Sequence, residues 1–413
     1  MGKLNPHSHK RLDTRQRIIV GITFFSMFFG AGNLIFPPYL GALAGNRTLV
    51  GMVGFVVSAV GLPILGVIVV AQAGGFGNLS ARVSKRFALV LGVAIMLTIG
   101  PLFAIPRTAS TSFEMAVVPF AGQQNLWLVR LLYSLVFFGL AFLVAQHPDK
   151  LSQVLGKVMG PLLLVMIVVL FAACLFAKHP GFANPQGSYA HHQLMQGFID
   201  GYQTDLLAGL YFGIVISANI SSMGVEDEHD NRAETGIGGI FTGIMLAIIY
   251  AMLGFVGAVS GSYQAIDGAT DTGATVLTNL TDRLFGHVGT MFVGLIFIVA
   301  CFNVCSGLLS TCSSYFHKQF GTVLGYRGWT IVFTLIALVI ANIGLSAIIK
   351  LSVPVLEALY PIAIVLVLLS LLHGVFTRHF PAVYFWTVLF TAIDSVANGI
   401  ANLVAAFGGR LVW

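Results

Sequence analysis

This sequence has few charged residues. Only 9% of its 413 residues are Asp, Glu, Lys or Arg, whereas 57% are hydrophobic and the mean hydropathy is +0.91. A soluble domain has about 25% charged residues, because its surface faces water. The shortage of charge therefore excludes a soluble enzyme, a disordered tail and a nucleic-acid-binding module.

Cysteine is also scarce, and the common motifs of soluble enzymes are missing. The four cysteines lie in apolar stretches without a CxxC spacing, so we expect packing residues rather than disulfides or a metal centre. Gly30-Ala31-Gly32 lacks the third glycine of a dinucleotide-binding loop, and Gly156-Lys157 lacks the Ser or Thr of a P-loop. We therefore expect neither an enzyme nor an organic cofactor, and no dependence on an ATPase subunit.

Long apolar runs make up most of the chain. A helix needs about 20 apolar residues to cross a bilayer. Eleven runs meet this length, at about 18–43, 48–74, 87–118, 126–146, 151–177, 197–222, 235–260, 287–316, 329–347, 349–373 and 381–407. The sequence thus predicts an all-α integral membrane protein with the lipid bilayer as its solvent.

The distribution of basic residues predicts the orientation. With these spans, 14 Lys and Arg residues fall on the side of the N-terminus and five on the other side. Cytoplasmic loops are enriched in Lys and Arg. We therefore expect a cytoplasmic N-terminus and an outer loop at 178–196.

Two spans contain residues that interrupt a helix. The first holds Gly30, Gly32 and Asn33 before a Pro pair, and the sixth holds Gly201, Asp205 and nearby polar residues. Unwound backbone at membrane depth is tolerated only where it is buried or lines a cavity. Two interrupted helices at corresponding positions in two halves are typical of transporters built from inverted repeats, with the site between them.

Three segments carry a resemblance to a known family. Residues 29–38 (FGAGNLIFPP), 100–109 (GPLFAIPRTA) and 201–205 (GYQTD) resemble signatures of the bacterial branched-chain amino acid:cation symporters, the BrnQ-like carriers. The similarity extends over essentially the whole chain. It implies a LeuT-like fold with broken helices 1 and 6, a multi-pass location in the bacterial inner membrane, and cation-driven import of leucine, isoleucine and valine.

The resemblance also implies the organisation of the chain. We expect a cytoplasmic tail (1–17), a first five-helix repeat (18–177), an outer loop (178–196), a second five-helix repeat (197–373) and an additional membrane helix (374–413). Family members usually have twelve spans. Eleven are predicted here, so we expect a C-terminus that is shorter than is usual in the family. A second departure is Asn303-Val304, where the family often has two hydroxyl residues.

A zwitterionic substrate requires partners for both of its charges. We expect free backbone amides around Ala31, Gly32 and Asn33 to bind the carboxylate, since helix N-termini attract anions. Carbonyls near Phe28 and Phe29 and at a break over Leu206–Gly209 would face the ammonium group. The predicted binding residues are Phe28, Phe29, Gly30, Ala31, Gly32, Asn33, Phe103, Ile105, Leu206, Leu207, Ala208, Gly209, Tyr211, Phe212 and Phe302.

The coupling cation is left open between H⁺ and Na⁺, with a preference for H⁺. A proton needs a titrating group, and Asp205 lies at an interruption. Sodium would need oxygens from the first span and the eighth. The predicted coupling residues are Asn33, Asp205, Ala300, Asn303 and Ser306, and the predicted gating residues are Arg107, Glu114 and Glu357.

Other functions remain as alternatives. A symporter for another neutral amino acid would share every feature above. A channel needs a continuous polar pore, and a membrane-embedded enzyme needs clustered reactive groups; the spans favour neither.

Overall fold

The computed structural model describes residues 11–121, 125–147, 152–202, 205–266, 271–373 and 382–406, and these residues form helices joined by turns and loops, without strands. The N-terminal half contains α1 (Thr14–Phe28), α2 (Ala31–Ala44), α3 (Thr48–Val56), α4 (Leu62–Gln72), α5 (Phe76–Ala81), α6 (Lys85–Leu97), α7 (Ala104–Ala116), α8 (Leu126–Ala145) and α9 (Gly160–Phe176). The C-terminal half contains α10 (Gln193–Tyr202), α11 (Leu206–Ser222), α12 (Glu228–Tyr263), α13 (Gly273–Phe285), α14 (His287–Phe320), α15 (Tyr326–Ala341), α16 (Leu345–Leu371) and α18 (Val383–Ala406).

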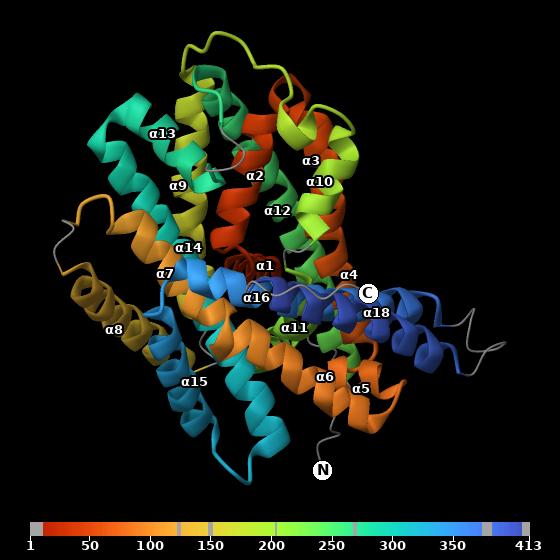
Figure 1. Cartoon of the computed structure of the whole chain (residues 1–413). Coiled ribbons are helices and arrows are strands. Elements are labelled where there is room, and N and C mark those ends of the chain that lie inside the picture. The colour runs from red at the N-terminus through yellow and green to blue at the C-terminus, as the bar shows by residue number, and fades with distance from the viewer. Residues whose placement is uncertain are drawn as a thin grey trace.

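Each of the eleven predicted spans has a helical counterpart, some of them made of two pieces. In the described residues, eight helical stretches are long and apolar enough to cross a membrane, or nine with the bent pair α10 and α11. The longest stretch, 31–72, includes a reversal of the chain at Gly45, whose φ of +52° favours glycine. α2 and α3 therefore pack side by side (Figure 1), and the all-α membrane architecture is confirmed.

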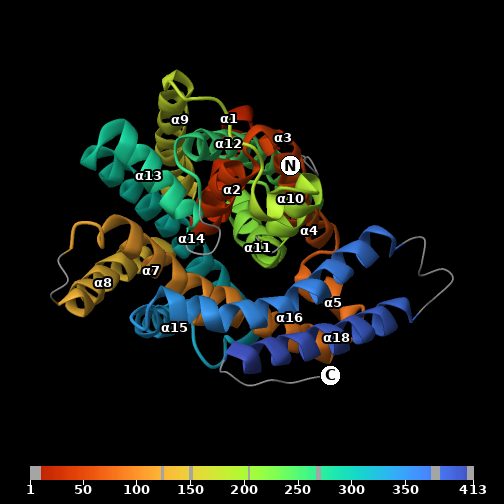
Figure 2. The same cartoon turned by 45° about the horizontal axis from the view of Figure 1, so that its top comes forward.

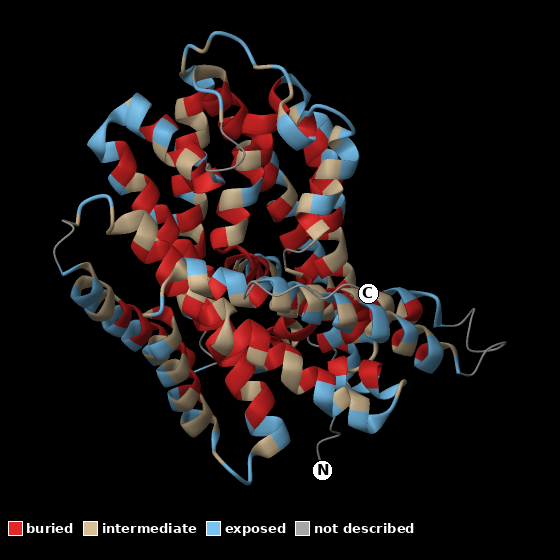
Figure 3. Ribbon diagram, in the orientation of Figure 1, coloured by how far each residue is buried: buried red, intermediate tan, exposed pale blue. Residues whose placement is uncertain are grey.

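The centre of the molecule is buried and its outer helix faces are apolar. Figure 3 shows buried residues concentrated where the helices meet. Large apolar side chains such as Trp127, Leu143 and Phe176 are exposed instead, with 64% or more of their surface accessible. A soluble protein rarely exposes so many apolar groups, whereas a membrane protein turns them to lipid.

Glycine residues let α2 and α12 pack closely against each other. A Cβ atom on Gly41 would lie 1.9 Å from the Gly254 carbonyl oxygen, and one on Gly257 would lie 2.0 Å from the Pro38 carbonyl oxygen. Small residues allow membrane helices to approach closely, which maximises van der Waals contact. This contact holds the second half of the broken first span against α12.

The remaining helices lie around this core. α16 and α18 run side by side along one edge of the molecule (Figure 2), and Gly399 permits their contact because its position faces Pro354 and Ala358. The predicted C-terminal helix is thus present as α18. The long connection between α12 and α14 contains the helix α13.

Candidate functional site

The first predicted helix break is present. α1 ends at Phe28, and Phe29 and Gly30 are extended, with φ and ψ of −79° and 92° and of −117° and −160°. The Gly30 amide donates to the Asn33 Oδ1 atom at 3.1 Å. Glycine is needed at residue 30 because a Cβ atom there would lie 2.9 Å from the Val304 side chain. The Pro pair lies inside α2 and does not end it.

The second break is also present, but earlier than predicted. α10 and α11 are bent by 49°, and α11 begins at Leu206 directly after Asp205. The predicted break over Leu206–Gly209 is wrong, because these residues form the first helical turn, closed by the Gly209 amide bonding to the Asp205 carbonyl at 2.9 Å. Asp is a favoured residue before a helix, yet the Asp205 carboxylate does not cap α11.

That carboxylate instead connects the two breaks. Asn33 Nδ2 donates to Asp205 Oδ2 at 2.6 Å and also contacts the Tyr250 hydroxyl on α12. Asn33 is 3% exposed and Tyr250 is fully buried. A single amide side chain therefore ties the break in the first span, the break in the sixth span and α12 together.

A third irregularity lies in span three, which the sequence reasoning treated as one continuous helix. A π-helical turn, Thr98–Leu102, separates α6 from α7, and Gly100 has non-helical φ and ψ of −94° and −126°. Phe103 is also irregular. The signal was available in Gly100-Pro101, since glycine and proline together weaken a helix.

The three irregular segments surround one cavity of about 80 Å³. Since one water needs about 10–15 Å³ on this measure, the cavity holds on the order of six waters. One lining residue carries a guanidinium group, Arg107 on α7, and one carries a carboxyl group, Asp205. The other lining residues are Met27, Phe28, Thr98, Ile99, Phe103, Ala104, Leu207, Ala208, Phe212, Val304, Leu308, Ser352, Leu356 and Tyr360.

The structure brings together five of the fifteen predicted binding residues around this cavity. Phe28, Phe103, Leu207, Ala208 and Phe212 line this cavity, and Met27, Ser352 and Tyr360 were missed because nothing in the sequence relates α1 and α16. Phe28 packs edge-on against Phe212, with ring centroids 4.9 Å apart. These two rings join α1 to α11 next to the breaks.

The other predicted binding residues lie outside this cavity lining. These are Phe29, Gly30, Ala31, Gly32, Asn33, Ile105, Leu206, Gly209, Tyr211 and Phe302. Phe302 packs against Phe137 on α8, with ring centroids 5.9 Å apart. Ile105 and Leu206 are buried.

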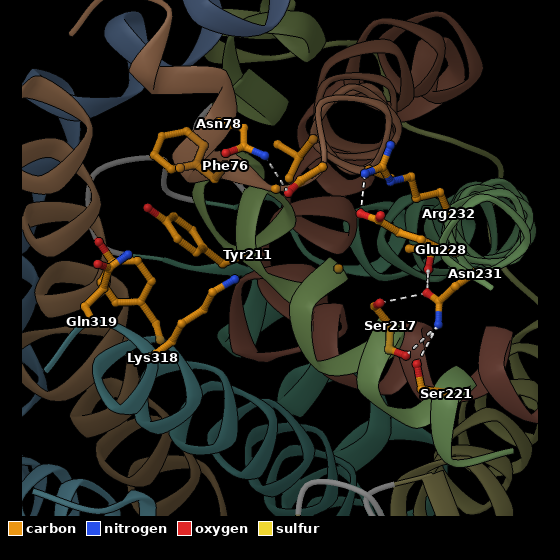
Figure 4. A pocket seen from close by; sticks show the side chains of 18 of the residues that line it. Phe76, Asn78, Tyr211, Ser217, Ser221, Glu228, Asn231, Arg232, Lys318 and Gln319 are labelled. Carbon is orange, nitrogen blue, oxygen red and sulfur yellow. Dashed lines mark hydrogen bonds and ion pairs between the residues drawn. The ribbon is translucent and has the colours of Figure 1, made fainter. Parts of the chain in front are cut away.

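Tyr211 faces a second, larger cavity of about 430 Å³. Figure 4 shows Tyr211 near Lys318 and Gln319, with Arg232 and Glu228 joined by an ion pair on the other side. Tyr211 packs against Phe76 and Tyr315, with ring centroids 4.8 and 5.4 Å away. Because Tyr211 and Phe212 are consecutive in α11, this helix separates the two cavities.

Two of the predicted coupling residues on α14 are buried without partners. The side-chain nitrogen and oxygen of Asn303 and the Ser306 hydroxyl have no hydrogen-bond partner among the described residues, and both side chains are 0% exposed. Leaving a buried polar group unpaired costs about 1–3 kcal/mol. Ala300 is buried on the same helix.

The three predicted gating residues lie in three different parts of the structure. Arg107 lines the small cavity, whereas Glu114 lies beside Arg130 and the Leu345 backbone. Glu357 accepts a hydrogen bond of 2.6 Å from Asn402 on α18. Neither glutamate lines the cavity between the breaks.

We expect Asn33→Leu to reduce leucine uptake about ten- to hundredfold, because it removes a hydrogen bond to a charged group that is worth about 1.5–3 kcal/mol. The measurement is initial uptake by purified protein in liposomes. Asn402→Leu is the matched control, since its amide bonds to Glu357 away from the cavity. Equal uptake by Asn33→Leu and the control would contradict a role for the connection between the breaks.

Comparison with solved structures shows the class of fold. The chain matches Mhp1, a nucleobase-cation-symport-1 family transporter, with a TM-score of 0.61 and 12% identity over 98% of this chain and 95% of that chain. It also matches the Eremococcus coleocola manganese transporter, with a TM-score of 0.57 and 14% identity over 100% of this chain and 91% of that chain. Together with the broken helices, these likenesses define an integral membrane protein with a LeuT-like fold.

Comparison with sequences shows the family. A family profile described as "Branched-chain amino acid transport protein" matches residues 13–410. The chain is 35% identical to the branched-chain amino acid permease BrnQ of Bacillus subtilis, over 95% of this chain and 88% of that protein. It is 37% identical to the branched-chain amino acid transport system 2 carrier protein of Pseudomonas aeruginosa, over 93% and 88%. This chain therefore belongs to the branched-chain amino acid transport protein family, as its three motifs predicted.

Proposed function

We propose that this chain imports leucine, isoleucine and valine across a bacterial inner membrane by symport with a cation. The observation that carries the proposal is the cavity between the breaks, which combines two opposite charges with a wall of Phe28, Phe103 and Phe212. An amino acid with a branched apolar side chain needs both kinds of surface. The volume of such an amino acid is comparable to the volume of the roughly six waters that the cavity holds.

Alternating access would move this cavity between the two sides of the membrane. With the N-terminus in the cytoplasm, the larger cavity beside Lys318 and Arg232 faces the cytoplasm, because cytoplasmic loops carry most basic residues. This cavity would then be the exit vestibule. Rocking of one helix group against the other around a fixed site is the usual motion of transporters with broken helices.

Asp205 is the proposed proton-coupling residue. It lines the cavity, and its carboxylate rather than its backbone connects the breaks. An ionisable side chain within a membrane is costly unless it is paired, so its presence favours a functional role. Protonation of Asp205 would weaken its acceptance of the hydrogen bond from Asn33 and thereby loosen the connection between the broken helices.

Sodium is the second candidate for the cation, and the unpartnered oxygens on α14 favour it. Asn303 and Ser306 are buried with free lone pairs, and amide and hydroxyl oxygens suit a hard cation. Val304, the residue after Asn303, lies close to Gly30 at the first break. Backbone carbonyls at the end of α1 would therefore complete an oxygen site with Asn303 and Ser306.

The deciding experiment is uptake of labelled leucine by proteoliposomes with independently imposed gradients. We expect a pH gradient to drive accumulation in choline buffer at a clamped membrane potential, without sodium. Isoleucine and valine should compete within about 200-fold of leucine, since one methylene separates substrates by only about 1–3 kcal/mol.

Three other results of this experiment would each contradict a different part of the proposal. Accumulation that requires sodium and is lost in Asn303→Val would replace the proton by sodium at the α14 site. Accumulation of a different neutral amino acid, with no competition by leucine, would replace the substrate class. Absence of any gradient-driven accumulation would overturn symport altogether.

A further inference from the structure

The cavity between the breaks holds an arginine, Arg107, for which the described residues provide no ion-pair partner. Arg107 and Asp205 both line it, and the guanidinium acts electrostatically on the carboxylate. No direct ion pair between them exists in the described part of the chain. The cavity thus separates two opposite charges by a space that a solute can enter.

The groups that surround Asp205 include one positively charged side chain, that of Arg107. Asp205 faces Asn33 from α2, Tyr250 from α12 and Tyr360 from α16. Of the described groups that act on Asp205, Arg107 is the one cation, and it also lies near Cys301 on α14. In a site of low dielectric constant, the positive charge of Arg107 therefore favours the ionised form of Asp205, together with the hydrogen bond from Asn33.

The chemistry of an arginine matches one end of an amino acid. A guanidinium presents parallel donors that bind a carboxylate at both oxygens. The Gly30 amide, in contrast, is already bonded to Asn33, and the first residues of α2 do not line the cavity. Arg107 is thus the donor in the cavity that is charged and available.

Resting on the proposed function, we propose that Arg107 binds the substrate carboxylate, and that Asp205 takes up a proton when it does so. The substrate ammonium group faces the carbonyls of Phe28 and Phe29 at the end of α1, so it is not the partner of Asp205. Once the substrate carboxylate pairs with Arg107, the guanidinium no longer compensates Asp205. One proton then moves from solution to a carboxylate oxygen of Asp205, and no covalent bond changes. Substrate and proton enter together because they share a single compensating charge.

The first test compares leucine with leucinamide, which has the same side chain and ammonium group but no carboxylate. For the wild type we expect leucine to inhibit labelled leucine binding at a concentration roughly a hundredfold lower than leucinamide does. Arg107→Gln should bring the two inhibitors within a few-fold, and Arg107→Lys should lie between, since it keeps the charge without the fork. Arg130→Gln, whose guanidinium lies over the Phe113 ring on α7 and not in the cavity, is the matched control.

The second test measures proton uptake by the purified wild-type protein in weak buffer. Leucine should cause uptake and leucinamide should not, and Asp205→Asn should abolish the leucine signal. The proposal is overturned if leucinamide causes the same uptake, or if Arg107→Gln keeps the wild-type preference for leucine. If Arg107→Gln does not fold, the proposal is still tested by comparing leucine with leucinamide in the wild type and in Arg107→Lys. A wild-type protein that does not bind leucine would instead refute the proposed function.

Discussion

Asp205→Asn should abolish gradient-driven accumulation of leucine while leaving the protein folded. An amide side chain has nearly the shape of a carboxylate and still offers an oxygen to Asn33, so the connection between the breaks survives. An amide does not titrate near neutral pH, so the proton gradient has no group to act on at this position. Leucine inside the vesicles should then reach the outside concentration and go no higher.

The measurement is the ratio of internal to external labelled leucine under an imposed pH gradient. Counterflow in the same vesicles reports whether the variant still binds and moves substrate. Asp394→Asn is the matched control, because Asp394 is exposed on α18. Accumulation by Asp205→Asn at the wild-type level would show that the coupling proton binds elsewhere.

Gly257→Val should have the largest effect on stability. The Cβ atom alone would lie 2.0 Å from the Pro38 carbonyl oxygen, which is backbone and cannot rotate away. Valine adds two methyl groups to that clash, so α2 and α12 have to separate along a contact that also includes Gly41 and Gly254. We expect destabilisation of about 3 kcal/mol or more, the upper end of overpacking effects.

Thermal unfolding in detergent, followed by the fraction of monodisperse protein, tests this expectation. Gly139→Ala is the control, because a Cβ atom at residue 139 on α8 meets no atom within 4 Å. It should unfold at the wild-type temperature or slightly above. A Gly257→Val protein that unfolds together with this control would mean that α2 and α12 do not approach as closely as described.

The relation between the breaks shows where sequence reasoning reached its limit. The glycines and polar residues of spans one and six predicted two interruptions, because such residues weaken a helix wherever they occur. The first break lies where expected, at Phe29 and Gly30, but the second ends at Asp205 instead of Gly209. Helix propensity locates a break only to within a turn, since tertiary packing decides which residues continue the helix.

The sequence did not predict which residues meet around the cavity. Arg107 and Asp205 were singled out separately, as a gate and as a proton site, and their common cavity was not foreseen. Ser352 and Tyr360 carried no signal because they lie in ordinary apolar sequence. The irregular turn at Gly100 was visible as a motif, but its place beside the cavity was not.

The sequence alone determined the membrane location, the helical class, the family and the two interrupted spans. These properties follow from composition and local chemistry, which act over a few residues at a time. Only the tertiary structure decided that Asn33 joins Asp205, that Arg107 faces the same cavity, and that the Asn303 side chain has no hydrogen-bond partner among the described residues. Such relations depend on how helices distant in the chain pack against one another, and packing is fixed by the shapes of all the side chains together.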